Sequence, residues 1–336
     1  MKRYTKRQIF FYLLLIFFPL VLSNELIGQQ ISIWTQYRRL HGLLNPAFVD
    51  PVQVFYGSPD QNVNIDLASR LSTRRGFGAK GPNAAAAHAV WDIVDSDAFA
   101  WRLGSAAIFE HSSPLLQRKL SFQFAGRKYL EKNNKFSFIS VGVGIGGIQS
   151  QIVKDLNPYH LGDPNLVFDQ RSDFNAELNA GLYAQFEILL NGRRNSDFLR
   201  PYFGFAHIGQ FLFDKNDSNS IGQFHFQLTP QQLFSLGLVY NKRDDSGFEL
   251  SSLIRTTQAV SPQWNLLLRH FRKFDDGVVF WLGGGITYDG STPHLFNFEA
   301  GIKTGNLKIS LGTDALLKQI NTPFGSMLEF GVGYAL

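Results

Sequence analysis

The feature of this sequence that most restricts its fold is a strict alternation of apolar residues with polar or small ones. In the final stretch, 326–336, every second residue is apolar: Leu328, Phe330, Val332, Tyr334 and Leu336. The residues between them are polar or small: Glu329, Gly331, Gly333 and Ala335. Because successive side chains of a strand point to opposite faces, this stretch predicts a strand with one apolar face. Such a final strand suits the closure of an outer-membrane barrel.

The same alternation recurs almost continuously from about residue 63 onward. In its clearest instance the apolar row is Leu178, Ala180, Leu182, Ala184, Phe186 and Ile188. The opposite row is Glu177, Asn179, Gly181, Tyr183, Gln185 and Glu187. Several alternating stretches are roughly 10 to 15 residues long, whereas soluble strands usually have about 5 or 6 and tilted membrane strands about 9 to 11. Strand length therefore favours a membrane barrel over a soluble sandwich.

Counting these stretches predicts about 14 antiparallel strands, an even number as bacterial single-chain barrels require. The expected strands are 63–70, 84–91, 99–110, 116–128, 136–149, 176–190, 199–213, 233–240, 248–257, 263–272, 278–288, 295–303, 307–313 and 326–336. A further candidate, 223–228, would break the parity and is assigned to an external loop. One set of alternate connections is uniformly short and the other contains the long ones. Since periplasmic turns are the short ones, both termini are expected in the periplasm.

Composition agrees with an all-β transmembrane barrel of one domain. The chain has 336 residues, 32 Phe and no Cys, and its mean hydropathy of -0.08 is far below that of a helical membrane protein. The absence of Cys excludes disulfides, thiolate metal sites and a lipid-modified Cys. The formal charge of +5 permits contact with acidic lipid or nucleic acid but selects neither. We expect outer-membrane lipid around the barrel and no nucleic acid.

The chain divides into three predicted parts. Residues 1–28 read as a signal peptide, with a basic start, an apolar run and Gly28 at a plausible cleavage point. The alternative is an uncleaved anchor, although the apolar run is short for a membrane span. Residues 29–60 are expected to form a periplasmic or lumenal segment, and 61–336 the barrel. Export followed by barrel formation predicts location in the outer membrane.

Within the second part, the stretch 36–48 lacks alternation, and its Asn45-Pro46 step disfavours helix at Asn45. We interpret it as an irregular segment tucked into the barrel or held at its periplasmic mouth. Many inward positions of the expected strands are Gly, Ala or Ser, which leaves room for such a plug. The hypothesis is that Asn45 and Pro46 fix this segment. The alternative is a passive lead-in to the first strand.

Motifs for chemistry are absent or weak. The glycines of 142–147 alternate with Val and Ile inside an expected strand, so they form a small inward row rather than a phosphate cradle. No nucleophile-elbow, zincin or Walker pattern occurs. Ser252 and His270 would both face outward, but nothing in the sequence ties them together. We expect no catalytic residue, no cofactor and no metal site.

Basic residues recur in the short turns, including Arg193, Arg194, Lys242 and Arg243. If these turns are periplasmic, the four residues contribute to a basic rim around that end of the barrel. The rim is either an electrostatic landing surface for a partner or acidic lipid, or simply a set of solvated turns.

Several patches resemble one known family. Gln36 and Tyr37, followed by Leu44-Asn45-Pro46-Ala47-Phe48, resemble the opening of mature PorP/SprF-family proteins. Stretches similar to strands of the family follow at 202–208, 240–242, 248–255, 262–266, 280–283 and 328–334. The resemblance implies an outer-membrane barrel of the Bacteroidota type IX secretion apparatus. Its members assist export or surface attachment of secreted proteins, including gliding adhesins, by engaging C-terminal sorting domains.

Three functions remain open from the sequence. The first is a non-enzymatic accessory barrel that docks a secreted cargo protein with a C-terminal sorting domain and other type IX secretion components. In that case Gln36, Tyr37, Asn45, Pro46, Ala47 and Phe48 are the candidate partner-binding or plug residues. The second is a channel or transporter, either porin-like or resembling the fatty-acid transporters. The third is an outer-membrane enzyme. Conductance across a planar bilayer distinguishes the first two.

Overall fold

The structure is a computed structural model of the chain, and it describes thirteen stretches. These are residues 42–49, 63–72, 83–112, 115–131, 134–152, 175–190, 197–211, 230–242, 246–257, 260–274, 277–290, 292–316 and 327–336. The predicted signal peptide (1–28) and the candidate loop hairpin at 223–228 lie outside them. Among the described residues, no helix is both long enough and apolar enough to cross a membrane.

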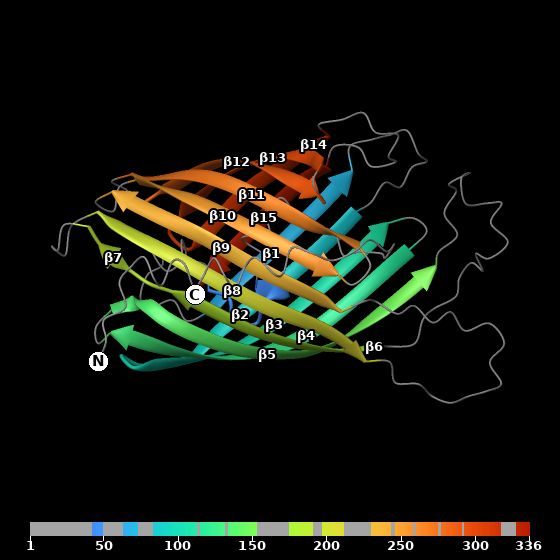
Figure 1. Cartoon of the computed structure of the whole chain (residues 1–336), viewed down its shortest axis with the longest axis horizontal. Coiled ribbons are helices and arrows are strands. Elements are labelled where there is room, and N and C mark those ends of the chain that lie inside the picture. The colour runs from blue at the N-terminus through green and yellow to red at the C-terminus, as the bar shows by residue number, and fades with distance from the viewer. Residues whose placement is uncertain are drawn as a thin grey trace.

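The described part of the chain forms one antiparallel sheet of fifteen strands (Figure 1). The strands are β1 (Val63–Ser72), β2 (Asn83–Asp95), β3 (Phe99–Ser112), β4 (Leu115–Glu131), β5 (Asn134–Ile152), β6 (Asn175–Gln185), β7 (Ile188–Leu189), β8 (Phe198–Phe211), β9 (Gln231–Lys242), β10 (Ser246–Thr257), β11 (Val260–Lys273), β12 (Val279–Asp289), β13 (Thr292–Thr304), β14 (Leu307–Leu316) and β15 (Met327–Ala335). Each strand pairs with its sequence neighbours, except that β7 pairs with β8 and not with β6.

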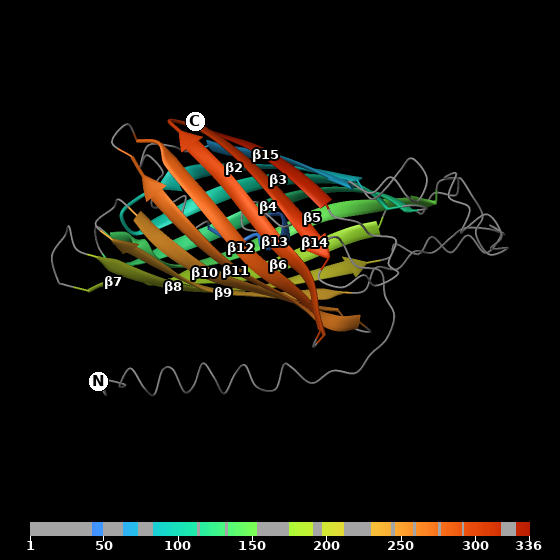
Figure 2. The ribbon, with the colours of Figure 1, turned by 90° about the horizontal axis from the view of Figure 1, so that it is seen from above.

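The sheet closes on itself through β1 and β15, whose register runs from Asn64 opposite Ala335 to Ser72 opposite Met327. The seam is completed by Val63 and Leu336, which exchange backbone hydrogen bonds of 3.1 and 2.8 Å. Because β6 also pairs with β8, the two-residue β7 is an extra piece on a closed barrel of fourteen strands. The strands run obliquely to the long axis of the barrel in both ribbon views (Figures 1 and 2). The predicted antiparallel β-barrel of about 14 strands is confirmed.

The outer face of the wall is apolar over the height that a membrane requires. On β4 the outward residues Leu120, Phe122 and Phe124 are 50%, 58% and 43% exposed. Exposed Arg118 and Lys128 bracket them. Ten residues of strand measure about 34 Å, or about 26 Å along the barrel axis at a tilt of about 40°. That height matches the apolar band of about 25 Å typical of outer-membrane barrels.

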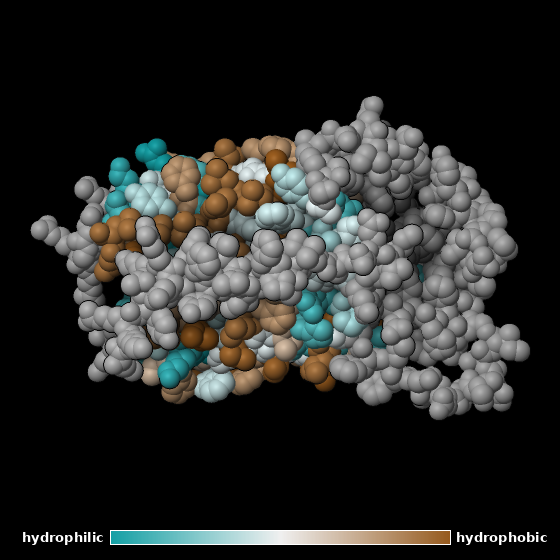
Figure 3. All heavy atoms as spheres, viewed as in Figure 1, coloured by the Kyte–Doolittle hydropathy of each residue, from teal (hydrophilic) through white to brown (hydrophobic). Residues whose placement is uncertain are grey.

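The space-filling view agrees with this pattern. In the part of this face that is not grey, hydrophobic residues predominate over the middle of the wall, and hydrophilic residues gather at the left-hand edge (Figure 3). The polar members of each alternating strand point into the lumen instead. The period-two pattern of the sequence thus corresponds to an apolar outer face and a polar inner face of the wall.

One predicted strand is interrupted. The expected single strand over 176–190 is wrong in this detail, because β6 ends at Gln185 and β7 begins at Ile188. The partner strand carries Pro201, whose carbonyl accepts from Phe186 N–H at 3.1 Å but whose nitrogen has no hydrogen to return. The next N–H, that of Glu187, donates instead to Ser137 Oγ at 2.9 Å. The ladder therefore breaks for two residues.

The two ends of the barrel differ in their connections. At one end, here called the short-turn end, the connections span 96–98, 132–133, 190–197, 243–245, 274–278 and 305–306. At the other, the long-loop end, they span 73–82, 113–114, 153–174, 212–230, 258–259, 290–291 and 317–326. β1 begins and β15 ends at the short-turn end. Figure 1 shows this end at the left, beside β7.

Candidate functional site

Residues 42–49, here called the lumenal segment, lie inside the barrel and add no strand to it. They form one helical turn followed by a tight turn. Phe48 N–H donates to Asn45 O at 3.0 Å, and Ala47 N–H donates to Asn45 Oδ1 at 2.9 Å. The Asn side chain thus stabilises the turn that Pro46 begins, as short Asn side chains commonly do.

Asn45 also attaches the lumenal segment to the wall. Its Nδ2 donates to Leu182 O on β6 at 3.3 Å and to Phe205 O on β8 at 3.2 Å. These carbonyls belong to facing residues of the ladder, so one amide bridges two neighbouring strands. Asn45 is only 1% exposed, and in such surroundings an amide needs all its partners. The arrangement satisfies both its donors and its acceptor.

Glycines of the wall make room for this close approach. A Cβ atom on Gly142 of β5 would lie 2.6 Å from the carbonyl carbon of Pro46, and one on Gly181 of β6 would overlap Asn45 Oδ1. Real Cβ atoms do not come so close to backbone, so any larger residue would force the segment away. We call the part of the wall formed by Gly142, Gly181 and Gly204 the glycine recess.

Both ends of the lumenal segment are hydrogen-bonded to the wall. Gly42 O accepts from Gln123 Nε2 on β4 at 2.7 Å, and Phe48 O accepts from Arg102 Nη1 on β3 at 3.4 Å. Between them, Leu43 packs with alanines of β1–β3, and Leu44 contacts that cluster and another on β8–β11. The segment is therefore hydrogen-bonded to β3, β4, β6 and β8, and its Leu44 side chain also reaches the cluster on β8–β11.

An aromatic cluster surrounds the last part of the lumenal segment, toward the short-turn end. Phe48 meets the ring of Tyr183 edge-on at 5.2 Å, and Tyr183 stacks on Tyr202 at 5.9 Å. Its other buried members are Ala47, Val49, Ala100, Tyr129, Phe138, Val239 and Phe271, with Trp281 against them. Beside the segment a cavity of ≈ 10 Å³ remains against β2–β4, which is room for about one water molecule. The lumen is closely filled here.

The opposite side of the lumen is filled by the wall's own charged side chains. Arg269 on β11 bonds Glu299 of β13 at 2.5 Å and Glu249 of β10 at 3.2 Å. Tyr202 OH donates to Glu249 at 2.9 Å. Nearer β1, Arg70 bonds Asp314 at 2.7 Å and lies 3.5 Å from Glu329. We call these side chains, from β8, β10, β11, β13, β14, β15 and β1, the ion-pair network.

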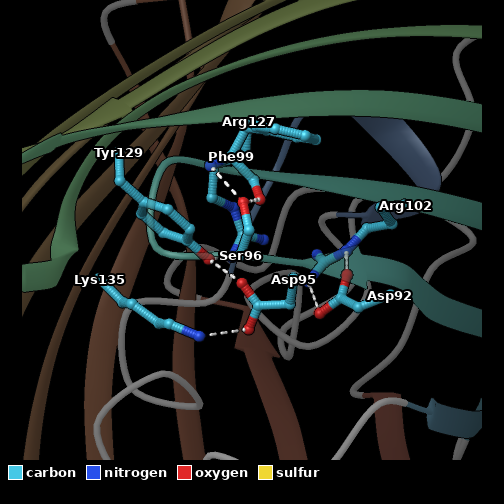
Figure 4. Close-up of polar contacts among 8 residues, drawn as sticks. All are labelled: Asp92, Asp95, Ser96, Phe99, Arg102, Arg127, Tyr129 and Lys135. Carbon is cyan, nitrogen blue, oxygen red and sulfur yellow. Dashed lines mark hydrogen bonds and ion pairs between the residues drawn. The ribbon is translucent and has the colours of Figure 1, made fainter. Parts of the chain in front are cut away.

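A second group of polar side chains lies at the short-turn end (Figure 4), and its Arg102 is the residue that donates to Phe48 O. Arg102 places its guanidinium on both oxygens of Asp92, at 2.6 and 3.0 Å. Asp95 accepts from Tyr129 OH at 2.9 Å and from Lys135 Nζ at 2.8 Å, one on each oxygen. With Arg127 these residues form the mouth cluster: Asp92, Asp95, Arg102, Arg127, Tyr129 and Lys135. No group of three possible metal ligands occurs in the described ranges.

The structure places some of the predicted site residues and not others. Asn45, Pro46, Ala47 and Phe48 lie together in the lumen, as described above. Lys242 is exposed at the short-turn end of β9. The remaining predicted residues, Gln36, Tyr37, Arg193, Arg194 and Arg243, lie outside the described stretches.

The two residues considered for catalysis are not brought together. Ser252 faces Leu266 in the ladder and His270 faces Phe248. The two positions are four residues apart along the strands, or about 13 Å. Ser252 Oγ instead accepts from Trp264 Nε1 at 2.5 Å. No nucleophile and base are paired at these positions.

Sequence reasoning missed the wall residues that hold the lumenal segment. Gln123, Arg102 and the glycine recess come from five different strands, and only the strand register aligns them. The available signal was the row of inward glycines at 142–147, which indicates space but not its occupant.

Comparison with protein families adds one decisive finding. A family model described as "Type IX secretion system membrane protein PorP/SprF" matches residues 27–334. The chain belongs to the PorP/SprF family. The family predicted from the sequence is confirmed, and the PorP/SprF barrel is a membrane protein of type IX secretion. Family and closed-barrel architecture together support an outer-membrane location.

Solved structures similar to this PorP/SprF protein include a FadL homologue and a hydrocarbon channel. A Pseudomonas aeruginosa FadL homologue has 11% identity and a TM-score of 0.45, covering 86% of this chain and 92% of its own. The CymD monoaromatic hydrocarbon channel has 11% identity and a TM-score of 0.49, covering 92% and 94%. Likenesses this distant carry no inference about what the chain binds. No curated protein matches its sequence significantly.

Proposed function

We propose that this protein is a non-enzymatic accessory barrel of type IX secretion in the outer membrane. In this role it docks a secreted cargo protein through the cargo's C-terminal sorting domain, together with other secretion components. Family membership supports the pathway. Docking through loops or added strands requires no catalytic group, which agrees with the separation of Ser252 from His270.

The observation that carries the proposal is the filled lumen. A diffusion channel needs a continuous hydrated passage, whereas here the lumenal segment occupies one side and buried ion pairs occupy the other. The intact protein is therefore expected to show no large steady conductance in a planar bilayer. A large steady conductance would overturn the docking role and favour the channel or transporter.

In the proposed orientation the short-turn end and both termini face the periplasm, because short turns are the periplasmic ones in such barrels. A signal peptide over residues 1–28 would direct export of the chain to the periplasm and would then be cleaved off. The mass of the mature protein isolated from outer membranes tests this directly. A mass that includes residues 1–28 would contradict it.

We assign Asn45 and Pro46 the role of holding the lumenal segment, which then supports docking. Replacing both with Ala removes the two hydrogen bonds to Leu182 and Phe205 and the rigid turn. Cargo display on the cell surface should fall while the barrel still reaches the membrane. Gly144→Ala is the control, because the atoms nearest its new Cβ belong to β4 and β6 and not to the segment. Normal display in the double variant would overturn the assignment.

The basic rim is proposed as a landing surface at the short-turn end. It comprises Arg193, Arg194, Lys242 and Arg243. Long-range attraction between exposed charges weakens as salt rises, so partner binding to the purified barrel should be salt-sensitive. Replacing Arg193 and Arg194 with Ser should weaken it. Unchanged binding would remove these two residues from the proposal.

A further inference from the structure

One guanidinium of the mouth cluster, that of Arg127, is not bonded to any carboxylate of the described residues. Both oxygens of Asp92 are taken by Arg102, and the two oxygens of Asp95 are taken by Tyr129 and Lys135. Of the three cationic side chains, Arg102 and Lys135 are therefore bonded to carboxylates, and exposed Asp97 adds a third carboxylate, whose charge attracts Lys135. Arg127 is hydrogen-bonded to none of the three.

Arg127 has only weak partners in the described part of the chain. Its Nη1 donates to Tyr129 OH at a long 3.4 Å. Its Nε is buried and has no hydrogen-bond partner. The guanidinium lies 4.8 Å from the ring centre of Phe138. A cation–π contact of this kind stabilises a charge only modestly, and a guanidinium offers five N–H donors. An anion is the missing partner.

The position of Arg127 determines where that anion comes from. On β4 it follows inward Ala125 and precedes inward Tyr129, so its side chain faces the lumen. The next residue, Lys128, is exposed on the outer face. Membrane lipids contact the outer face, and a ligand of Arg127 must therefore enter through the barrel mouth.

The mouth cluster is open on the short-turn side. The side chains of Lys135 and Asp95 are 41% and 26% exposed, whereas those of Arg102 and Asp92 are 18% and 17% exposed. Exposure thus falls from the rim inward. A ligand from the short-turn side therefore meets Lys135 and Asp95 before the residues behind them.

We propose that the mouth cluster is a carboxylate-binding site, in which Arg127 is the main residue that binds the carboxylate and Lys135 lies at the entrance. The ligand is an acidic segment of a partner polypeptide that enters from the short-turn end. A planar guanidinium matches a carboxylate with two parallel hydrogen bonds. The identity of the partner rests on the proposed docking function, but the site itself does not.

The test measures binding of a short fluorescent peptide of alternating glutamate and glycine to the full-length barrel in uncharged detergent. The same peptide with glutamine in place of glutamate is the control ligand. Arg127→Gln should weaken binding of the glutamate peptide about ten- to a hundred-fold, as expected for loss of a charged hydrogen-bond pair. Arg127→Lys keeps the positive charge but cannot form two parallel hydrogen bonds. Its affinity for the glutamate peptide should therefore lie between those of the wild type and Arg127→Gln.

Lys128→Gln is the matched control variant, because it removes the same charge from the adjacent residue on the opposite face. It should leave binding unchanged. Equal binding of the two peptides, an Arg127→Gln barrel that binds like the wild type, or an equal loss in Lys128→Gln would each overturn the site. So would tighter binding of glycerol phosphate, a lipid-headgroup mimic, than of the glutamate peptide.

If Arg127→Gln does not fold, the wild-type protein still decides the question. A photo-cross-linkable glutamate peptide should attach to residues of β2–β5 at the short-turn end. Attachment only to the outer face or to the long-loop end would overturn the site. Peptide binding with purified protein is independent of cargo display in cells, so failure of one leaves the other standing.

Discussion

The two sides of the lumen are filled in different ways. On the side of β2–β8 the wall presents glycines, and a separate stretch of chain, the lumenal segment, packs against them. On the side of β9–β15 and β1 the wall presents long charged side chains that pair with one another. Tyr202 belongs to both, since its ring stacks on Tyr183 and its hydroxyl bonds Glu249.

From this difference we expect that the lumen can be emptied on one side without weakening the wall of the barrel. The ion-pair network joins strands of the wall, so its removal weakens the wall. The lumenal segment touches the wall but contributes nothing to the ladder, so its removal leaves every strand pairing in place. The ion-pair network is therefore part of the wall's stability, whereas the lumenal segment is an occupant of the lumen, although a buried Lys119–Glu177 pair also joins β4 to β6 on its side.

Deleting residues 29–60 should have the largest effect on the lumen. The barrel strands begin at Val63, so the ladder can still close, and the glycine recess is left without its occupant. The deletion variant should insert into the membrane and show a large steady conductance that the intact protein lacks, as measured in a planar bilayer. If the deletion variant stays closed, the segment is not what fills that side.

Arg269→Met should cause the largest loss of stability. It leaves buried Glu249 and Glu299 without this cation, and breaking a buried ion pair costs about 3–5 kcal/mol. Urea unfolding in lipid vesicles measures the change. Arg272→Met on the same strand is the control, because Arg272 is exposed. The bilayer conductance of Arg269→Met should stay low. Should it rise to that of the deletion, the two sides would not be separable.

Gly181→Ala should disturb only the occupied side. Its new Cβ overlaps Asn45 Oδ1, and overpacking of this kind costs about 1–3 kcal/mol. Gly144→Ala is the matched control. Asn45→Ala removes the atom that the new Cβ overlaps. In the Asn45→Ala background, Gly181→Ala should therefore lower the free energy of unfolding much less than it does in the wild type. Additive losses in the unfolding free energies would show that Gly181 and Asn45 are not coupled.

The smallest effect is expected at the mouth. The Lys135–Asp95 pair is 2.8 Å long, but its side chains are 41% and 26% exposed. Lys135→Gln should cost about 0–1 kcal/mol, and less at high salt. The loss from Arg269→Met should hardly change with salt, because that pair is buried. A comparable salt dependence of both variants would contradict this ranking.

Much of the wall was predictable from the sequence. In 177–188, for example, the alternation depends only on which face of the strand is apolar, and each residue shows this by itself. The number of strands and their approximate bounds therefore follow from such local patterns. The break after Gln185 was not predicted, although Pro201 in the partner strand was a visible signal. It also depends on Ser137, which lies on a third strand and is brought near only by the barrel.

The contents of the lumen were much less predictable. The small inward residues indicated space for a plug, and the Asn45-Pro46 step indicated an irregular segment. Nothing local states that Asn45 meets Leu182 and Phe205, more than a hundred residues away. The same is true of Arg269 and its two carboxylates. Contacts between inward rows follow from register around the whole circumference.

The seam between β1 and β15 has a consequence for the order of assembly. The first strand of the wall meets the last, so the circumference stays incomplete until residues 327–336 have arrived. The lumenal segment comes before every strand in the chain and ends up enclosed by all of them. Once Val63 and Leu336 have joined, it can enter or leave only through an end of the cylinder.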